Sequence, residues 1–534
     1  MIDDKNSEII LCKGIKMDKN YENVISYNEE SMVNLCRNNQ IYNAREYTFL
    51  GDTNYIDIEC EYSVAMYANY VAFINPTFGN KWIFAWVTDV KLMNPSTSRI
   101  YFDIDVWSTW YSRFNVGKAF IEREHVEDDT IGKHTIPENL ELGDYVVNTE
   151  NKCNLMTTYD YILASNVDPV KSGGTYPLAS VKGGIYNGIM HGFKYYYFMN
   201  TSATELPDVL KAISDAGKAD SVVAIFVAPH FFFEKSDPTE LDNGQVKQTY
   251  SAMTCDWEQN GGNAPTKPTR IDTYEPVNNK LFTFPYCYLR MTNNNGNDAI
   301  YHFERFANNN QNKCYFQFKS SICPGMSIIL YPNSYDGITN NFNECLQAGK
   351  FPVCGWSNDA YTNWLTQNAV NIATNLAGNA LTIAGSGASM MGGNAMGASG
   401  VLGGISGIAN TLGTVFQHKL NPIQAEGNTN TGDVKTSSGL NTFTAYTMSI
   451  KKEMAKIIDD YFSRFGYQVN EVKQPNLNSR QEFNFIKVGG LDELVSGNIP
   501  ASDLEKINSI FRKGVTIFHN YNNFGDYTIS NPII

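Results

Sequence analysis

A stretch of 59 residues, numbered 360–418, contains no Asp, Glu, Lys or Arg, although these residues make up 18% of the 534-residue chain. Apolar residues recur every three or four positions over 361–384 and again over 401–416, the spacing that is typical of amphipathic helices. A passage rich in Gly, Ser and Met, 385–400, separates the two runs. The pattern predicts a helix–hinge–helix hairpin whose polar faces carry no charge.

The lengths of the two predicted helices are close to the thickness of a membrane. At about 1.5 Å per residue, the first would span about 36 Å and the second about 24 Å, which brackets the roughly 30 Å hydrocarbon core of a bilayer. However, Asn, Gln and Thr interrupt each apolar run before the roughly 18 residues that a permanent span requires. Gly-x-x-x-Gly pairs between 393 and 407 would allow close helix approach in lipid. We therefore expect conditional insertion rather than permanent residence in a membrane.

The large apolar side chains of this segment need a place away from water, because burying each of them is worth about 1.5–3 kcal/mol. A helical hairpin in an ordinary protein core would provide it, and so would a membrane or several such loops sealing one another. The residues that we expect to insert into a membrane or plug a channel are Trp364, Leu365, Ile372, Leu376, Leu381, Ile383, Met390, Met391, Met396, Val401, Leu402, Ile405, Ile408, Leu412, Val415 and Phe416.

The rest of the chain predicts a β-rich α+β fold. Hydrophobic residues make up 43% and aromatic residues 13%, which excludes general disorder and favours β structure. Short alternating runs separated by Asn, Pro and Gly predict antiparallel strands, with helices at 205–219 and 447–465. The expected strands are 55–59, 70–74, 81–87, 99–106, 221–227, 281–289, 301–306, 313–318 and 327–331. A change of texture over 153–280 predicts an inserted α+β domain.

The chain is acidic, with a net charge of −14. This argues against tight nucleic-acid binding through phosphate neutralisation, although DNA could pass along an acidic channel without sticking. The N-terminal 20 residues lack the apolar run of a secretory signal, so no export is predicted. Ten Cys without a C-x-x-C pair favour free thiols.

Motifs of catalysis are missing from the sequence. It contains no phosphate-binding Gly-x-x-x-x-Gly-Lys-Ser/Thr loop, no Gly-x-Ser-x-Gly and no His-Glu-x-x-His. We therefore expect no catalytic residue, cofactor or metal. The acidic run Glu122–Asp129 could hold a divalent cation, but a solvated or inter-subunit charged face is the favoured interpretation.

Three neighbouring stretches, Ser98–Trp110, Ala119–Asp129 and His134–Tyr145, resemble the tail knob (tail tube) proteins of phi29-like podoviruses, the small short-tailed phages of Gram-positive bacteria. The resemblance implies a structural protein without enzymatic activity. It would form a homohexameric tube at the distal end of the virion tail, through which the genomic DNA leaves. Its hydrophobic loops would first close the tube and then form a pore in the host cytoplasmic membrane.

Applied to this chain, the resemblance implies a specific domain plan. Residues 1–152 would form one β tube domain, and 281–358 with 440–534 a second. Residues 153–280 would be the outer knob domain and 359–439 the long hydrophobic loop. The implied partners are other copies of the chain, an upstream collar or connector protein, and a distal tail plug or cell-wall hydrolase.

Two other functions remain open from the sequence. A pore-forming toxin or effector would also use an uncharged hydrophobic hairpin, but it would need an export route. A glycan hydrolase would use two carboxylates on an aromatic β scaffold, and no such pair can be singled out.

Overall fold

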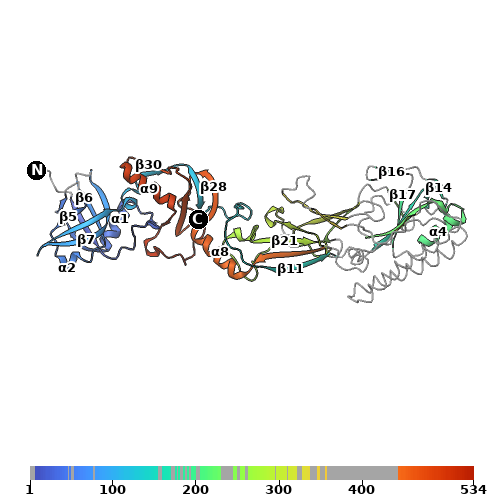
Figure 1. Ribbon diagram of the computed structural model, residues 1–534, viewed down its shortest axis with the longest axis horizontal. Helices are drawn as coiled ribbons and strands as arrows, with labels where there is room; N and C mark the ends of the chain where they lie inside the picture. The colour runs from blue at the N-terminus through green and yellow to red at the C-terminus, as the bar shows by residue number, and fades with distance from the viewer. Residues whose placement is uncertain are drawn as a thin grey trace. The chain divides into compact units, whose positions relative to one another are not determined.

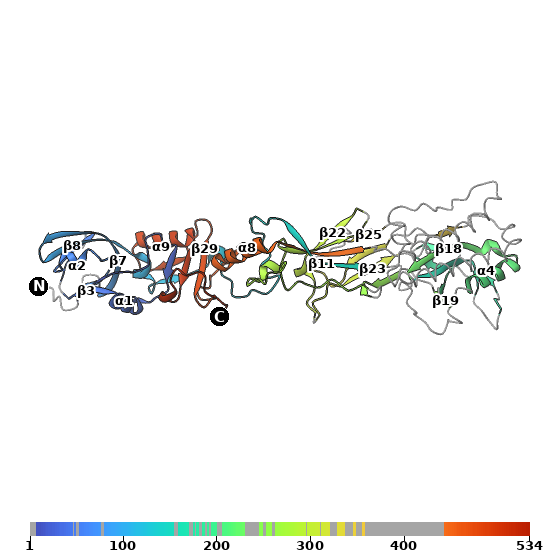
Figure 2. The ribbon, with the colours of Figure 1, turned by 90° about the horizontal axis from the view of Figure 1, so that it is seen from below.

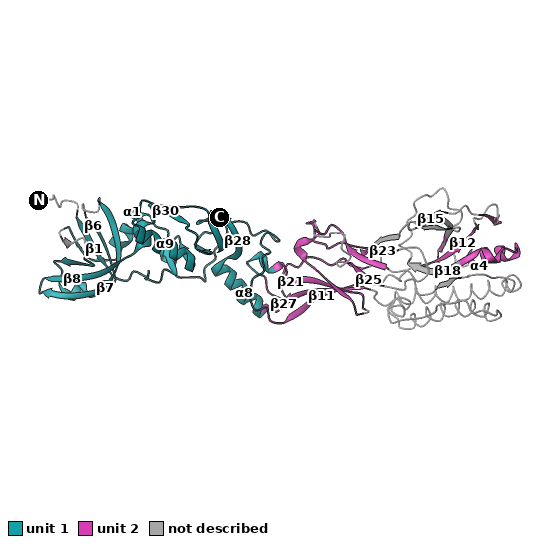
Figure 3. Cartoon of the chain, turned by 45° about the horizontal axis from the view of Figure 1, so that its top comes forward, with its two compact units in different colours: residues 1–142, 276–281, 453–534 teal, residues 143–275, 282–452 magenta. Residues whose placement is uncertain are grey.

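The structure is a computed structural model (Figure 1). It describes residues 7–534 except 46, 50–52, 76–78, 154–158, 170–174, 177, 181–183, 187–188, 192–193, 200–204, 230–244, 249–252, 259–261, 295, 310, 321–327, 337–344, 349–354 and 358–442. The chain divides into two compact units (Figure 3). Unit 1 comprises 1–142, 276–281 and 453–534, and unit 2 comprises 143–275 and 282–452, so the chain passes between them four times.

The N-terminal part of unit 1 is a seven-stranded antiparallel sheet, in which β7 and β8 form a long hairpin (Figure 2). In spatial order its strands are β3 (Gln40–Ala44), β1 (Glu8–Cys12), β6 (Tyr70–Asn75), β7 (Lys81–Asn94), β8 (Thr97–Ile104), β5 (Tyr55–Ile58) and β4 (Thr48–Phe49).

Around β1 and β6 both faces of this sheet are buried. Successive side chains of a strand point to opposite faces, so one strand contributes to two clusters. Ile10 and Cys12 of β1 join one hydrophobic cluster, and Ile9 and Leu11 join the other. The first cluster includes residues of helix α1 (Glu29–Asn38). Asn28 caps this helix, since its Oδ1 accepts a hydrogen bond from the Ser31 amide at 2.8 Å.

A second sheet of unit 1 joins strands from both ends of the chain. Its order is β2 (Asn23–Ile25), β31 (Val515–Phe518), β29 (Phe483–Val488), β10 (Ala119–Glu124) and β28 (Tyr467–Lys473), with only the first pair parallel. The remaining elements of this unit are α2 (Tyr62–Ala65), α3 (Val106–Trp110), α8 (Lys452–Phe465), α9 (Ala501–Lys513), η10 (Tyr521–Asn523) and the pair β9 (Phe114–Val116) with β30 (Val495–Gly497).

Unit 2 contains three antiparallel sheets of four or five strands. The first is β11 (Tyr145–Cys153), β27 (Phe443–Ile450), β21 (Cys287–Thr292) and β22 (Asp298–Tyr301). The second is β19 (Gln245–Gln248), β17 (Lys194–Met199), β12 (Tyr159–Ser165), β18 (Val222–Pro229) and β26 (Gly355–Ser357). The third is β20 (Met253–Asp256), β23 (Phe316–Ser320), β24 (Ile328–Pro332) and β25 (Leu346–Ala348).

Short elements complete unit 2. They are the pair β13 (Val167–Asp168) with β14 (Ala179–Ser180), the pair β15 (Gly184–Tyr186) with β16 (Ile189–His191), helix α4 (Glu205–Asp215), and the 3-10 turns η3 (Ala219–Ser221) and η8 (Phe303–Arg305). A further 3-10 turn, η7 (Asn279–Phe282), lies where the chain passes from unit 1 to unit 2.

The β-rich part of the predicted fold class is confirmed, and so are most of the predicted strands. Several predicted elements are wrong in part. The helix expected over 205–219 ends at Asp215, the strand expected over 99–106 ends at Ile104, and the strand expected over 313–318 begins only at Phe316. Residues 447–450 belong to β27 and not to a helix, because β27 lies between β11 and β21 and bonds to both. The strand expected from 281 begins only at Cys287, and the one expected over 301–306 ends at Tyr301.

The predicted limits of the tube, knob and loop domains remain predictions. The boundary expected at 152/153 falls at the last residue of β11. Among the helices that the structure describes, none is long and apolar enough to cross a membrane.

Candidate functional site

All sixteen residues predicted to insert into a membrane or plug a channel lie within 358–442, outside the described residues. The sequence also pointed to the acidic run Glu122–Asp129, and the structure describes all of its residues. This run lies at the end of β10 and just beyond it, in unit 1.

Two carboxylates of the acidic run form ion pairs with lysines of neighbouring strands. Glu122 pairs with Lys487 of β29 at 2.7 Å, and Glu124 pairs with Lys473 of β28. The Glu124 side chain is only 1% exposed, and burial raises the pKa of its carboxyl. The interpretation of the run as a solvated or inter-subunit charged face is thus wrong for Glu124, whose side chain is buried within unit 1. In the part of the chain that the structure describes, no group of three His, Cys, Asp or Glu residues could hold a metal ion.

His125 is also buried and is held as a neutral ring. Its Nδ1 accepts a hydrogen bond from the Phe485 amide at 2.8 Å, and its Nε2 lies 3.1 Å from the carbonyl oxygen of Ser463, to which it donates. Both nitrogens are satisfied only if Nδ1 carries no proton. Burial, with a smaller effect of Arg480, lowers the pKa of His125 to about 3.

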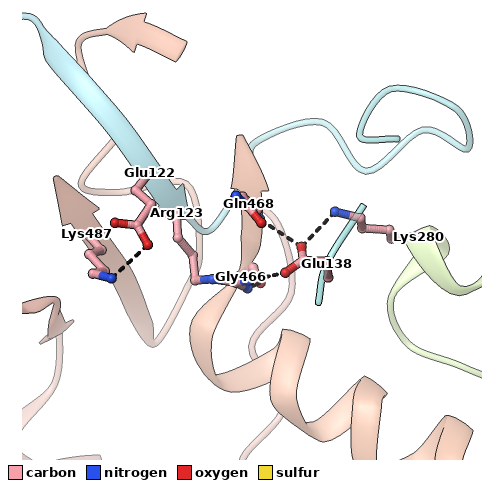
Figure 4. A network of polar contacts seen from close by, with 7 residues as sticks. All are labelled: Glu122, Arg123, Glu138, Lys280, Gly466, Gln468 and Lys487. Carbon is pink, nitrogen blue, oxygen red and sulfur yellow. Dashed lines mark hydrogen bonds and ion pairs between the residues drawn. The ribbon is translucent and has the colours of Figure 1, made fainter. Parts of the chain in front are cut away.

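Glu138 is the centre of a polar network that joins three separate parts of unit 1 (Figure 4). Its Oε1 accepts hydrogen bonds from the Lys280 ammonium at 2.7 Å and from the backbone N–H of Gln468 at 2.9 Å. Its Oε2 accepts from Arg123, which also donates to the Gly466 carbonyl at 2.7 Å. The Glu138 and Lys280 side chains are 1% and 2% exposed, so a fully buried carboxylate is matched by two cations.

The short segment 276–281 docks into unit 1 next to this network. Both oxygens of Asp459, on α8, accept hydrogen bonds from backbone amides of the segment, from Val277 at 2.8 Å and from Asn278 at 3.0 Å. The Asn278 side chain donates to Asp459 at 2.7 Å and to Ser463 at 2.8 Å. Val277 and Asn278 are thus held by acceptors on α8.

Gly466 makes this arrangement sterically feasible at the end of α8. Its φ is +64°, and a Cβ atom there would lie 2.0 Å from the Glu124 carbonyl oxygen. Any other residue would clash with the backbone of β10 and carry an unfavourable φ. The glycine therefore permits the close approach of α8 and β10.

The sequence alone did not predict which residues form this network. Arg123 and Glu138 lie in stretches that carried the resemblance to tail knob proteins, but they were not singled out. Nothing in local spacing connects Glu138 with Lys280, 142 residues away, or with Gln468, 330 residues away. The arrangement has no nucleophile or acid–base pair exposed to a substrate; chemically, it holds segments together.

Comparison with known proteins gives concordant matches over both ends of the chain. The family model of the C-terminal domain of the Bacillus phage phi29 tail knob protein gp9 matches residues 252–532. The family model of the caudoviral major tail protein N-terminus matches residues 5–115.

Individual relatives are similar over nearly their whole length. The tail knob protein gp9 of Bacillus phage phi29 is 24% identical, with 93% of each chain covered. The gp9 protein of Bacillus phage B103 is 23% identical over 87% of this chain and 88% of the relative. The solved structure of the bacteriophage C1 tail knob protein gp12 has the same fold, with a TM-score of 0.59 and 14% identity, covering 99% of this chain and 100% of that chain.

Proposed function

Because the chain belongs to the family of phi29-type tail knob proteins and is a structural protein of the phage tail, we propose that six copies form a tube through which the genome leaves the virion. The tube would stand at the distal end of the tail. The two family matches, at 5–115 and 252–532, support a tube built from the β domains 1–152, 281–358 and 440–534. Residues 153–280 would form the outer knob.

The observation that carries the mechanism is the charge-free segment 360–418. Its two apolar runs are too hydrophobic for water and too interrupted for permanent residence in lipid. Six such loops inside a tube would bury one another and close the channel. On release they would bury the same side chains in the host cytoplasmic membrane and form a pore for DNA entry.

The charge of the chain suits a channel for DNA. Six copies at −14 each would carry −84 in total. Carboxylates along the lumen would repel the phosphate backbone, so DNA would pass without binding. Genomic DNA is accordingly a passing cargo and not a sequence-specific ligand.

The proposal implies other tail components as partners. A collar or connector protein would hold the upstream end of the tube, and a distal plug or a cell-wall hydrolase would dock on the knob. No cofactor is required.

Electron microscopy of the purified chain, with and without residues 360–418, tests the proposal. We expect six-fold rings or short tubes from both proteins, with density blocking the channel only when the segment is present. The mass should be near six times 59.8 kDa. A compact monomer, or a channel equally blocked without the segment, would contradict the proposal.

A further inference from the structure

A pocket of about 460 Å³ opens in unit 1 beside the Glu138 network. It lies among β10, α8, β28 and β29, and the last residue of α9, Lys513, also lines it. Figure 4 shows two of its lining pairs, Glu122 with Lys487 and Arg123 with Glu138.

The charges around the pocket do not balance. Two carboxylates, Glu122 and Glu138, line the pocket together with three cations, Arg123, Lys487 and Lys513. Both carboxylates are already engaged by ion pairs. Among the described residues, Lys513 has no ion-pair partner. The side chains that line the pocket therefore carry a surplus of one positive charge, in a chain whose net charge is −14.

Three aromatic side chains, Tyr461, Phe465 and Phe485, also line the pocket. Tyr461 and Phe465 of α8 contact each other with ring centroids 5.1 Å apart, and Phe465 meets Phe485 edge-on at 5.2 Å. The Arg123 guanidinium lies 4.9 Å from the centroid of the Tyr461 ring. A ligand would thus find apolar ring surface next to cationic groups.

We propose that this pocket binds a small organic anion in which a planar ring carries a phosphate or carboxylate. The anionic group pairs with Lys513 and with Lys487, whose side chain is 35% exposed and can turn from Glu122 to the ligand. The ring packs against Tyr461 and Phe465.

Titration calorimetry of the full-length chain with phenyl phosphate tests the inference. We expect saturable binding that Lys513→Gln and Lys487→Gln each weaken about ten-fold, in keeping with loss of a charge-assisted contact. Lys506→Gln is the matched control, since Lys506 is an exposed lysine of the same helix outside the pocket. Thermal unfolding of each variant confirms that it folds.

Three results would overturn the inference. The first is absence of saturable binding by the folded wild-type chain. The second is equal weakening by Lys506→Gln and Lys513→Gln, which would indicate only a general charge effect. The third is equal affinity for inorganic phosphate and phenyl phosphate, which would remove the role of the aromatic wall.

Discussion

The Lys280 ammonium lies 2.7 Å from Oε1 of Glu138, although the two residues are 142 positions apart. Lys280 belongs to the short segment 276–281, which the chain contributes to unit 1 between two long parts of unit 2. The pair therefore fixes to unit 1 a segment whose sequence neighbours on both sides belong elsewhere. Because the pair is buried, we expect the stability of unit 1 to depend on it.

Glu138→Gln should destabilise unit 1 strongly. The neutral amide would leave Lys280 and Arg123 without their counter-charge in a buried place, and breaking a buried pair in this way costs about 3–5 kcal/mol. Urea unfolding measures the loss. Glu505→Gln serves as control, because Glu505 pairs with Arg512 at the surface and its side chain is 60% exposed. Equal stability of both variants would show that the buried network contributes nothing.

Asn278→Ala should loosen the docked segment without unfolding the rest of unit 1. The change removes the side-chain donors to Asp459 and Ser463 but keeps the backbone intact. Hydrogen exchange at the Val277 and Asn278 amides should become faster, because these amides depend on Asp459. Asn522→Ala, at an exposed asparagine, should leave their exchange unchanged. Unaltered exchange in Asn278→Ala would contradict the docking role.

Acid should destabilise unit 1 through His125. Its pKa is lowered from 6.5 to about 3 in the folded protein, so between these pH values the unfolded chain binds a proton that the folded one does not. The free energy of unfolding therefore falls as the pH falls from about 6.5 towards 3, by up to roughly 1.4 kcal/mol per pH unit. His134 and His519 have pKa values lowered by burial and add to the same trend.

His125→Gln isolates this contribution. The variant should be less stable than the wild type at pH 7, because the Phe485 amide loses its acceptor. The difference between the two proteins should then shrink on acidification. Curves of unfolding free energy against pH that run parallel from pH 7 to pH 4 would show that His125 does not titrate as inferred.

Lys81 should make the free energy of unfolding depend on pH above pH 7. Its Nζ lies 2.7 Å from the centroid of the Trp110 ring and has no hydrogen-bond partner among the described residues. Burial, assisted by Arg113, lowers its pKa to about 7 against the opposing effects of Glu29 and Asp503. Between pH 7 and 10.5 the unfolded chain again binds the extra proton, so stability should rise with pH.

Lys81→Met should remove that rise and be neutral or stabilising at pH 7, because an apolar side chain replaces a buried amine without a partner. Lys91→Met is the matched control in the same strand, at a position with 59% exposure. Thermal unfolding from pH 7 to pH 10 compares the three proteins. A marked loss of stability in Lys81→Met alone would mean that the amine makes a contact worth more than its burial costs.

The sequence predicted most reliably what depends on neighbouring residues. Strand β6 was predicted over 70–74 and α4 over 205–219, although α4 ends at Asp215, two residues before Gly217, whose φ is +66°. Where long-range pairing decides, local patterns were insufficient. Residues 447–450 are a strand because two neighbours bond to them, and this overrides the helical spacing that follows.

The described site was less predictable than the fold for the same reason. Glu124 and His125 stood in a charged run that is typical of an exposed face, yet both are buried. The partners that make their burial tolerable, Lys473 and the Phe485 amide, lie about 350 residues further on. A run of charged residues in the sequence does not show which of them form ion pairs. Here the pairing of β10 with β28 and β29 brings the partners together.

The most direct test of the proposed mechanism is dye release from phospholipid vesicles by the full-length chain. The matched variant combines Ile372→Asp, Leu376→Asp, Ile405→Asp and Ile408→Asp, at positions predicted to lie on the apolar faces of segment 360–418, and each charge at the bilayer centre costs about 2.5–3.5 kcal/mol. We expect the wild type to release the dye and the variant to assemble normally but release none. Equal release by both proteins would contradict membrane insertion of this segment.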